Sequence, residues 1–199
     1  MNASLPTQIY QLKVTLRHSQ PPIWRRIQVP ADIRLDKLHA VLQAVMDWEG
    51  YHLHQFMANE KDRLNTQFYG VPVPDTAFDM YKMLDERKFR LNQILTAPKR
   101  KITYEYDFGD SWDHDLMLEK ILPAEPGVRY PRCLAGKRNR PPEDVGGVWG
   151  YQVFLEAIAD PQHEEHEQWV EWIGGEYDPE AFDLDAVNRR LQPARRRRG

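Results

Sequence analysis

Apolar and polar residues alternate in three parts of the chain, which is the pattern of half-buried β-strands. The first two parts, residues 8–17 and 23–29, flank a turn at Pro21-Pro22 and predict an N-terminal β-hairpin. Apolar residues then recur at helical spacing over residues 35–47, which predicts an amphipathic helix packed on that hairpin. The third alternating part, residues 102–118, is rich in aromatic residues and predicts a second hairpin.

We expect the second hairpin to turn through a three-residue loop, Gly109-Asp110-Ser111. Loops of this length that contain glycine are common in hairpins. The length also keeps apolar side chains opposite one another, and such matching sets strand register. The expected pairs are Phe108 with Trp112, Tyr106 with His114, Tyr104 with Leu116, and Ile102 with Leu118. This register makes His114 a buried hydrogen-bonding residue on the core side.

The opposite face of this hairpin is acidic. The expected register sets Asp107 opposite Asp113 and Glu105 opposite Asp115, and Asp110 lies at the loop tip. Directly opposed like charges destabilise a sheet. Either this face is fully solvated or a cation meets it, and the cation is then an Arg or Lys of this chain, a group on a partner, or a metal ion.

Two other stretches carry candidate chemistry. Residues 51–56 predict a strand with His52 and His54 on one face, a spacing that can chelate a metal but is more often structural. Residues 133–150 predict a long loop dense in glycine, proline and charge, centred on residues 141–147. Long ordered loops are often functional.

The remaining segments complete the expected fold. Residues 60–80 predict an irregular excursion with a short strand near 68–71, and the last fifty residues predict helices. Asp160-Pro161 and Asp178-Pro179 each predict a helix start, because proline is favoured at the first helical position. The fold class is therefore α+β: an N-terminal β-hairpin and helix, a mixed or antiparallel sheet with the second hairpin, and C-terminal helices. We expect one domain over 8–191 and a basic flexible tail over 192–199.

Charge and composition narrow the possible functions. The net charge is −3. Without the tail arginines, Arg195 to Arg198, the chain has 23 basic and 30 acidic residues. An acidic body argues against broad nucleic-acid binding, so nucleic acid is expected to be reached only through that tail. The sequence has no apolar run long enough for a membrane span and no signal-peptide pattern. Cys133 is the only cysteine, which excludes an intrachain disulfide and a cysteine-based zinc site.

The sequence contains no complete catalytic motif: Gly-x-Ser-x-Gly, His-Glu-x-x-His and a glycine-rich dinucleotide turn are all missing. We therefore expect a non-catalytic cytoplasmic binding module without a cofactor, whose partner is a protein or a cationic ligand. Its site is expected where the hairpin tip meets the 141–147 loop. The expected binding residues are Asp107, Asp110, Trp112, Asp113, Glu143 and Asp144. The first alternative is a metal-dependent hydrolase that uses the acids with His114 or the His52/His54 pair. The second is a DNA-associated protein that acts through the arginine tail.

Four groups of residues resemble the Ri-plasmid ORF-3-like family. They are residues 22–27 with 35–39, residues 52–56, the aromatic and acidic hairpin 104–114, and residues 141–147 with 150–151 and 178–183. The resemblance implies an α+β fold and brings no established activity, although some members are labelled transposon resolvase-like or insertion-element passengers. A serine resolvase needs a nucleophilic serine amid arginines and a DNA-binding helix pair, and neither is found in this sequence. Many members have cysteine where this chain has Arg140, so a metal site built on such cysteines is not expected here.

Overall fold

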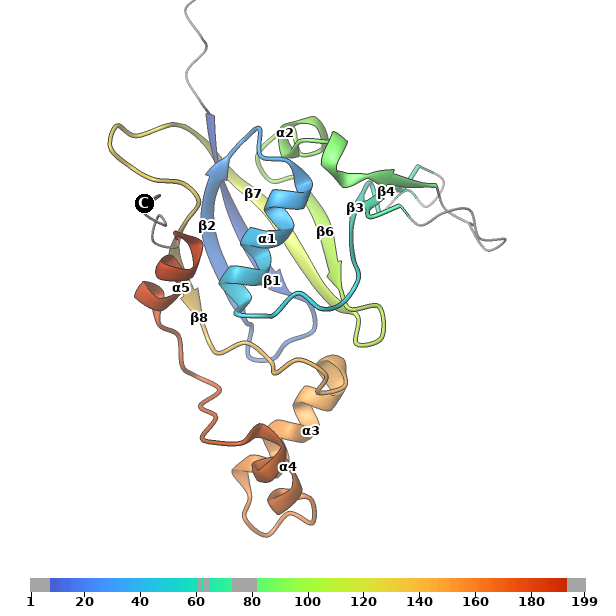
Figure 1. Cartoon of the computed structure of the whole chain (residues 1–199), viewed down its shortest axis with the longest axis vertical. Helices are drawn as coiled ribbons and strands as arrows, with labels where there is room; N and C mark the ends of the chain where they lie inside the picture. The colour runs from blue at the N-terminus through green and yellow to red at the C-terminus, as the bar shows by residue number, and fades with distance from the viewer. Residues whose placement is uncertain (1–7, 61, 63–64, 73–81, 193–199) are drawn as a thin grey trace, which may run out of the picture.

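The computed structural model of the chain describes residues 8–60, 62, 65–72 and 82–192, and its centre is an eight-stranded sheet (Figure 1). The strand order is β5-β4-β3-β6-β7-β1-β2-β8, and every neighbouring pair is antiparallel except β4 and β5. The strands are β1 (Gln8–Leu16), β2 (Trp24–Pro30), β3 (His54–Ala58), β4 (Gln67–Gly70), β5 (Met83–Asp85), β6 (Lys101–Tyr106), β7 (Trp112–Pro123) and β8 (Arg132–Lys137). The helices are α1 (Leu35–Met46), the 3₁₀ helix η1 (Glu86–Lys88), α2 (Leu91–Ile94), α3 (Gly147–Ala159), α4 (His166–Ile173) and α5 (Leu184–Leu191). The α+β prediction is confirmed.

Helix α1 lies across one face of the sheet, as its apolar stripe predicts (Figure 1). Its buried side chains Leu35, Leu38 and Leu42 meet the apolar face of the β1–β2 hairpin, and the three are at most 1% exposed. Burying a leucine side chain is worth roughly 1.5–3 kcal/mol. The predicted N-terminal hairpin and helix are therefore confirmed as one half of the core.

The hairpin of β6 and β7 has a different register from the one expected. Tyr106 lies opposite Trp112 and Tyr104 opposite His114, a shift of one pair, so the loop spans 107–111. Phe108 leaves the core face and is 45% exposed. The predicted three-residue loop is therefore wrong, while the expected buried position of His114 is confirmed at 1% exposure.

The polar face of this hairpin is largely neutralised within the chain. Glu105 now faces Asp113, and Asp107 has left the strand for the loop. Arg17, at the end of β1, lies 3.7 Å from the Asp113 carboxylate and donates a 2.8 Å hydrogen bond to Asp115. Burial raises the pKa of Asp115, but hydrogen bonds from Lys101 and Arg17 outweigh burial and the net shift is downward. A cation of this chain therefore meets the acidic face, one of the alternatives left open by the sequence.

Several predicted boundaries in the second half of the chain are wrong. The stretch expected to be a loop from 133 contains β8, an edge strand that pairs with β2. Helix α4 begins at His166 instead of Pro161, and α5 begins at Leu184, capped by Asp183, instead of Pro179. Asn188 on α5 bonds both the backbone N–H and the carbonyl of Cys133 on β8, which fastens this helix to the edge of the sheet.

Candidate functional site

Two loops that are far apart in the sequence meet at the tip of the β6–β7 hairpin. The Gly146 backbone N–H donates to the Asp110 carboxylate at 3.2 Å. Gly147 has φ +68°, and a Cβ atom there would lie 2.5 Å from the Asp110 carbonyl oxygen, so only glycine permits this approach. The two loops are therefore packed backbone against backbone, and the predicted junction exists.

Glu143 links this junction to the chain that follows α1. Its carboxylate accepts a 2.6 Å hydrogen bond from the Tyr106 hydroxyl and a 2.8 Å hydrogen bond from the Glu49 backbone N–H. Burial and the bond to Glu143 raise the pKa of Tyr106. The neighbouring Pro141 carbonyl accepts from the indole N–H of Trp48 at 3.0 Å. Glu143 thus holds three segments together instead of facing a ligand.

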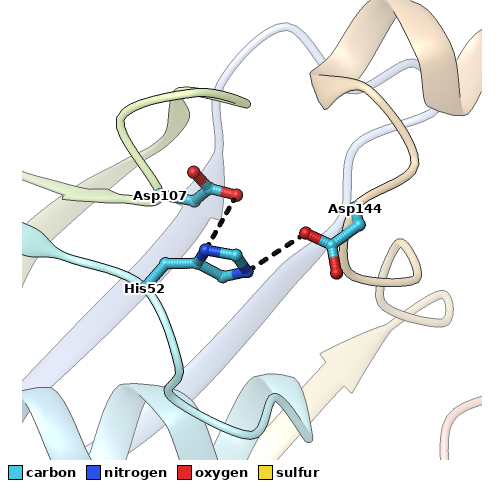
Figure 2. Close-up of side chains that lie close together, drawn as sticks. All are labelled: His52, Asp107 and Asp144. Carbon is cyan, nitrogen blue, oxygen red and sulfur yellow. Dashed lines mark ion pairs between the residues drawn. The ribbon is translucent and has the colours of Figure 1, made fainter.

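His52 lies in the middle of the junction, between two carboxylates (Figure 2). Its Nε2 is 3.1 Å from Asp144 Oδ1, and its Nδ1 is 3.7 Å from Asp107 Oδ2. The 3.1 Å contact is short enough for an ion pair but lacks hydrogen-bond alignment, since Nε2 has no hydrogen-bond partner among the described residues. One ligand atom from each of the three residues lies within 4.8 Å of the other two.

The two carboxylates are held in different ways. Asp107 is fixed, because its Oδ1 accepts from the Gly109 N–H and its own N–H donates to the Leu53 carbonyl. Asp144 is free to adjust, because its side chain is 70% exposed. Both residues have positive φ, 59° and 61°, a conformation in which Asp and Asn are the side-chain residues best tolerated. A buried, hydrogen-bonded acid and an exposed acid therefore face one imidazole.

The structure places the six expected binding residues in three different environments. Asp107 and Asp144 converge on His52, while Asp110 and Glu143 clamp the loops together. Trp112 is 0% exposed and offers no surface to a ligand, so its expected role as a binding residue is wrong. Asp113 lies on the polar face of the sheet, 3.7 Å from Arg17, and its role in binding stays a prediction. Sequence reasoning named His52 only as half of a pair with His54.

The histidines expected to serve a hydrolase are occupied elsewhere. His54 is buried, bonds Glu86 at 2.8 Å and stacks on His39 with ring centroids 3.5 Å apart. Burial, with His54 alongside, lowers the pKa of His39 to about 3. His114 is enclosed, its Nδ1 bonds the Trp112 carbonyl, and burial lowers its pKa to about 4. The predicted His52/His54 chelating pair is therefore not formed.

The only cysteine is not an activated nucleophile. Cys133 is 4% exposed, and burial raises the pKa of its thiol. The basic tail that was expected to reach nucleic acid lies outside the described residues. Within the described part of the chain, no helix has both the length and the apolar character needed to cross a bilayer.

Comparison with known proteins fixes the family. A family model described as plasmid pRiA4b ORF-3-like protein matches residues 8–186. The chain belongs to this family. A relative, "Uncharacterized protein y4hQ" of Sinorhizobium fredii (strain NBRC 101917 / NGR234), is 39% identical over 182 residues, which is 91% of this chain and 89% of that protein.

A solved structure shares the fold of this plasmid pRiA4b ORF-3-like protein. It is the crystal structure of a protein of unknown function, MM3350, from Methanosarcina mazei Go1. The two chains are 43% identical with a TM-score of 0.80, and the match covers 91% of this chain and 98% of that one. The fold and the family are therefore established together, whereas the names of these two relatives state no activity.

Proposed function

We propose that this plasmid pRiA4b ORF-3-like protein is a binding module that takes a divalent transition-metal ion at His52, Asp107 and Asp144. The observation that carries the proposal is the convergence of three ligand atoms from three separate segments within 4.8 Å. Association with mobile elements remains a prediction from the family resemblance.

The chemistry of the three side chains supports a metal of intermediate softness. One imidazole nitrogen with two carboxylate oxygens suits zinc, manganese or iron, whereas Mg²⁺ and Ca²⁺ favour sites made of oxygen alone. Metal–ligand bonds of about 2.1 Å place neighbouring ligand atoms roughly 3–3.5 Å apart. One ion binds one ring nitrogen, and Asp107 lies beside Nδ1 whereas Asp144 lies beside Nε2. An ion on Nδ1, next to the fixed Asp107, therefore requires the exposed Asp144 carboxylate to move towards that nitrogen by on the order of 1 Å.

Charge balance also favours a cation here. A neutral His52 leaves two carboxylates facing one imidazole, and a protonated His52 still leaves one negative charge uncompensated within the trio. A divalent ion bound to a neutral imidazole neutralises both carboxylates. Among the described residues, no Lys or Arg forms an ion pair with Asp107 or Asp144. This contrasts with Asp113 and Asp115, which already have Arg17.

Calorimetric titration of chelator-treated protein with Zn²⁺, Mn²⁺ and Mg²⁺ tests the proposal. We expect one Zn²⁺ per chain, tighter binding of Zn²⁺ than of Mn²⁺, the weakest binding for Mg²⁺, and a higher melting temperature with Zn²⁺. Asp144→Asn keeps the positive φ tolerable while removing the charge, so it should fold normally and bind Zn²⁺ at least 10-fold more weakly. His52→Gln should do the same.

The control is His18→Gln, which removes an exposed histidine outside the trio. It should bind Zn²⁺ like the wild type. The proposal is overturned if the wild type takes up no metal, or if both trio variants bind Zn²⁺ as tightly as the wild type.

A further inference from the structure

The second surface that stands out is helical, and it lies beyond one end of the sheet. Helices α3 and α4 project away from the strands (Figure 1). We define the acidic lobe as residues 147–176, which comprise these two helices, the turn between them and the three residues after α4. Its small core is aromatic: the Phe154 ring lies 5.5 Å from the Trp169 ring and 6.1 Å from the Trp172 ring, centroid to centroid. These contacts support the lobe from inside.

The charge of this lobe has one sign. Residues 147–176 contain seven acidic residues and no Lys or Arg, and the wider stretch 141–188 contains thirteen acidic residues and again no Lys or Arg. The whole protein carries only −3. The negative charge is therefore concentrated in the helical end of the molecule, and the rest of the chain is net basic. Such a one-signed surface raises the local concentration of cationic partners.

The same lobe exposes large apolar side chains. Trp149 is 84% exposed and Trp172 is 45% exposed, and Val153 and Val170 are each more than 40% exposed. Trp149 and Val153 are four residues apart on α3 and so share one helix face. Beside Trp149 lies an open surface cavity of about 1280 Å³ that runs to the turn at Pro21-Pro22. Tryptophan is enriched at the energetic centres of protein interfaces.

We propose that the acidic lobe docks a basic amphipathic segment of a partner protein, with the partner's Lys or Arg side chains on the lobe carboxylates and its apolar residues on Trp149 and Val153. Charge complementarity selects this occupant, because a purely apolar partner would leave the carboxylates of the lobe unpaired. Cations also bind favourably over exposed indole rings. This surface is separate from the His52 trio and does not depend on a metal.

The test uses a labelled synthetic peptide whose helix carries lysine on one face and leucine on the other. Fluorescence anisotropy in the presence of a chelator measures its binding to the full chain. Trp149→Ala should weaken binding at least 10-fold without loss of stability, because this indole lies almost wholly in solvent. Glu156→Gln should also weaken binding, because this exposed carboxylate lies three residues after Val153 on the same face of α3. A rise from 50 to 500 mM salt should weaken wild-type binding at least 10-fold.

Tyr51→Ala is the matched control, because Tyr51 is 79% exposed but lies outside the lobe. This variant should bind like the wild type, and a peptide of the same composition with mixed faces should bind at least 10-fold more weakly. The proposal is overturned if Trp149→Ala binds as tightly as the wild type or if Tyr51→Ala loses as much. It is also overturned if sedimentation shows a salt-sensitive dimer that Trp149→Ala abolishes, because the occupant is then a second copy of this chain.

Discussion

Arg17 is the residue whose replacement tests the electrostatic account of the sheet most directly. Its guanidinium donates two hydrogen bonds to Glu60, at 2.9 and 2.6 Å, and one to Asp115 at 2.8 Å. A further 2.6 Å bond reaches the Thr103 hydroxyl. Arg17→Met keeps much of the aliphatic stem but leaves these acceptors, and nearby Asp113, without their shared cation.

The expected cost follows from the partners and their exposure. Hydrogen bonds to charged groups contribute roughly 1.5–3 kcal/mol each. Arg17 has two carboxylate hydrogen-bond partners and is 19% exposed, but Glu60 is 42% exposed, so solvent screening places the total at the low end. We expect Arg17→Met to lower the free energy of unfolding by about 3 kcal/mol at pH 7. For a chain of this size that corresponds to a melting temperature roughly 6–12 °C lower.

The effect should depend on pH with a definite sign. The hydrogen bond from Arg17 lowers the pKa of Glu60 to about 2, from 4.5. The stability that this pairing supplies is complete above pH 4.5 and is lost as the pH falls towards 2. The difference between wild type and Arg17→Met should therefore be largest at pH 7 and narrower at pH 3.5.

Urea denaturation at both pH values measures this difference. Arg26→Met is the control, because Arg26 pairs with a single carboxylate, that of Glu119, and should cost only about 1 kcal/mol. A loss below 1 kcal/mol for Arg17→Met at pH 7, or a difference that widens on acidification, would refute the reasoning.

Two further predictions concern the loop junction and the core. Gly147→Ala should lower the free energy of unfolding by roughly 2 kcal/mol more than Gly174→Ala in urea denaturation, because both glycines have φ +68° but only the first would press a Cβ onto the Asp110 carbonyl; equal losses would contradict the close approach. His114→Gln should have a lower free energy of unfolding than wild type at pH 7. In the unfolded chain the imidazole is protonated below about pH 6.5, whereas the buried imidazole, with a pKa of about 4, stays neutral. The wild type therefore loses stability on acidification, and the difference between the two proteins should shrink by up to about 3 kcal/mol between pH 7 and pH 4. A gap that stays constant across this range would show that His114 is not buried in its neutral form.

The sequence pattern predicted which face of the sheet each side chain occupies better than it predicted which residues pair across the strands. The observed register differs from the expected one by two residues of one strand relative to the other, and an even shift leaves every side chain on its original face. Tyr104, Tyr106 and Trp112 are therefore buried in either register. Loop geometry decides between the registers. Asp107 and Ser111 both take positive φ, and the Ser111 N–H bonds the Asp107 carbonyl at 2.7 Å, which closes a longer loop than the glycine suggested. The alternation of apolar and polar residues reveals neither the positive φ values nor this hydrogen bond.

Helix starts were missed for a related reason. The side chains of Asp160 and Asp178 each accept a hydrogen bond from the N–H two residues on, which makes local turns. Asp183 accepts from the N–H three residues on and does cap a helix. The same Asp chemistry serves turns and caps. A helix follows Asp183 because Val187 and Leu191, which lie on it, pack against the core.

The sequence predicted where the candidate site lies but not which residues form it. Glycine, proline and charge marked the 141–147 loop, and register marked the hairpin tip. The part played by His52 depends on the chain turning before β3 begins at His54, so that the two histidines separate. That separation is a property of long-range packing, since Glu86 and His39 hold His54 inside.

The position of β1 in the sheet has a consequence for how the protein folds. β1 precedes every other described strand in the chain, yet it lies between β2 and β7, and the Arg17 and Asp115 side chains that meet beside it are 98 residues apart. Pairings of such long range slow folding, because a large loop must close first. On the ribosome the β1–β2 hairpin and α1 must therefore wait with one strand edge open until β7 emerges. A chain that stops before residue 112 would leave that edge permanently unpaired and prone to aggregation.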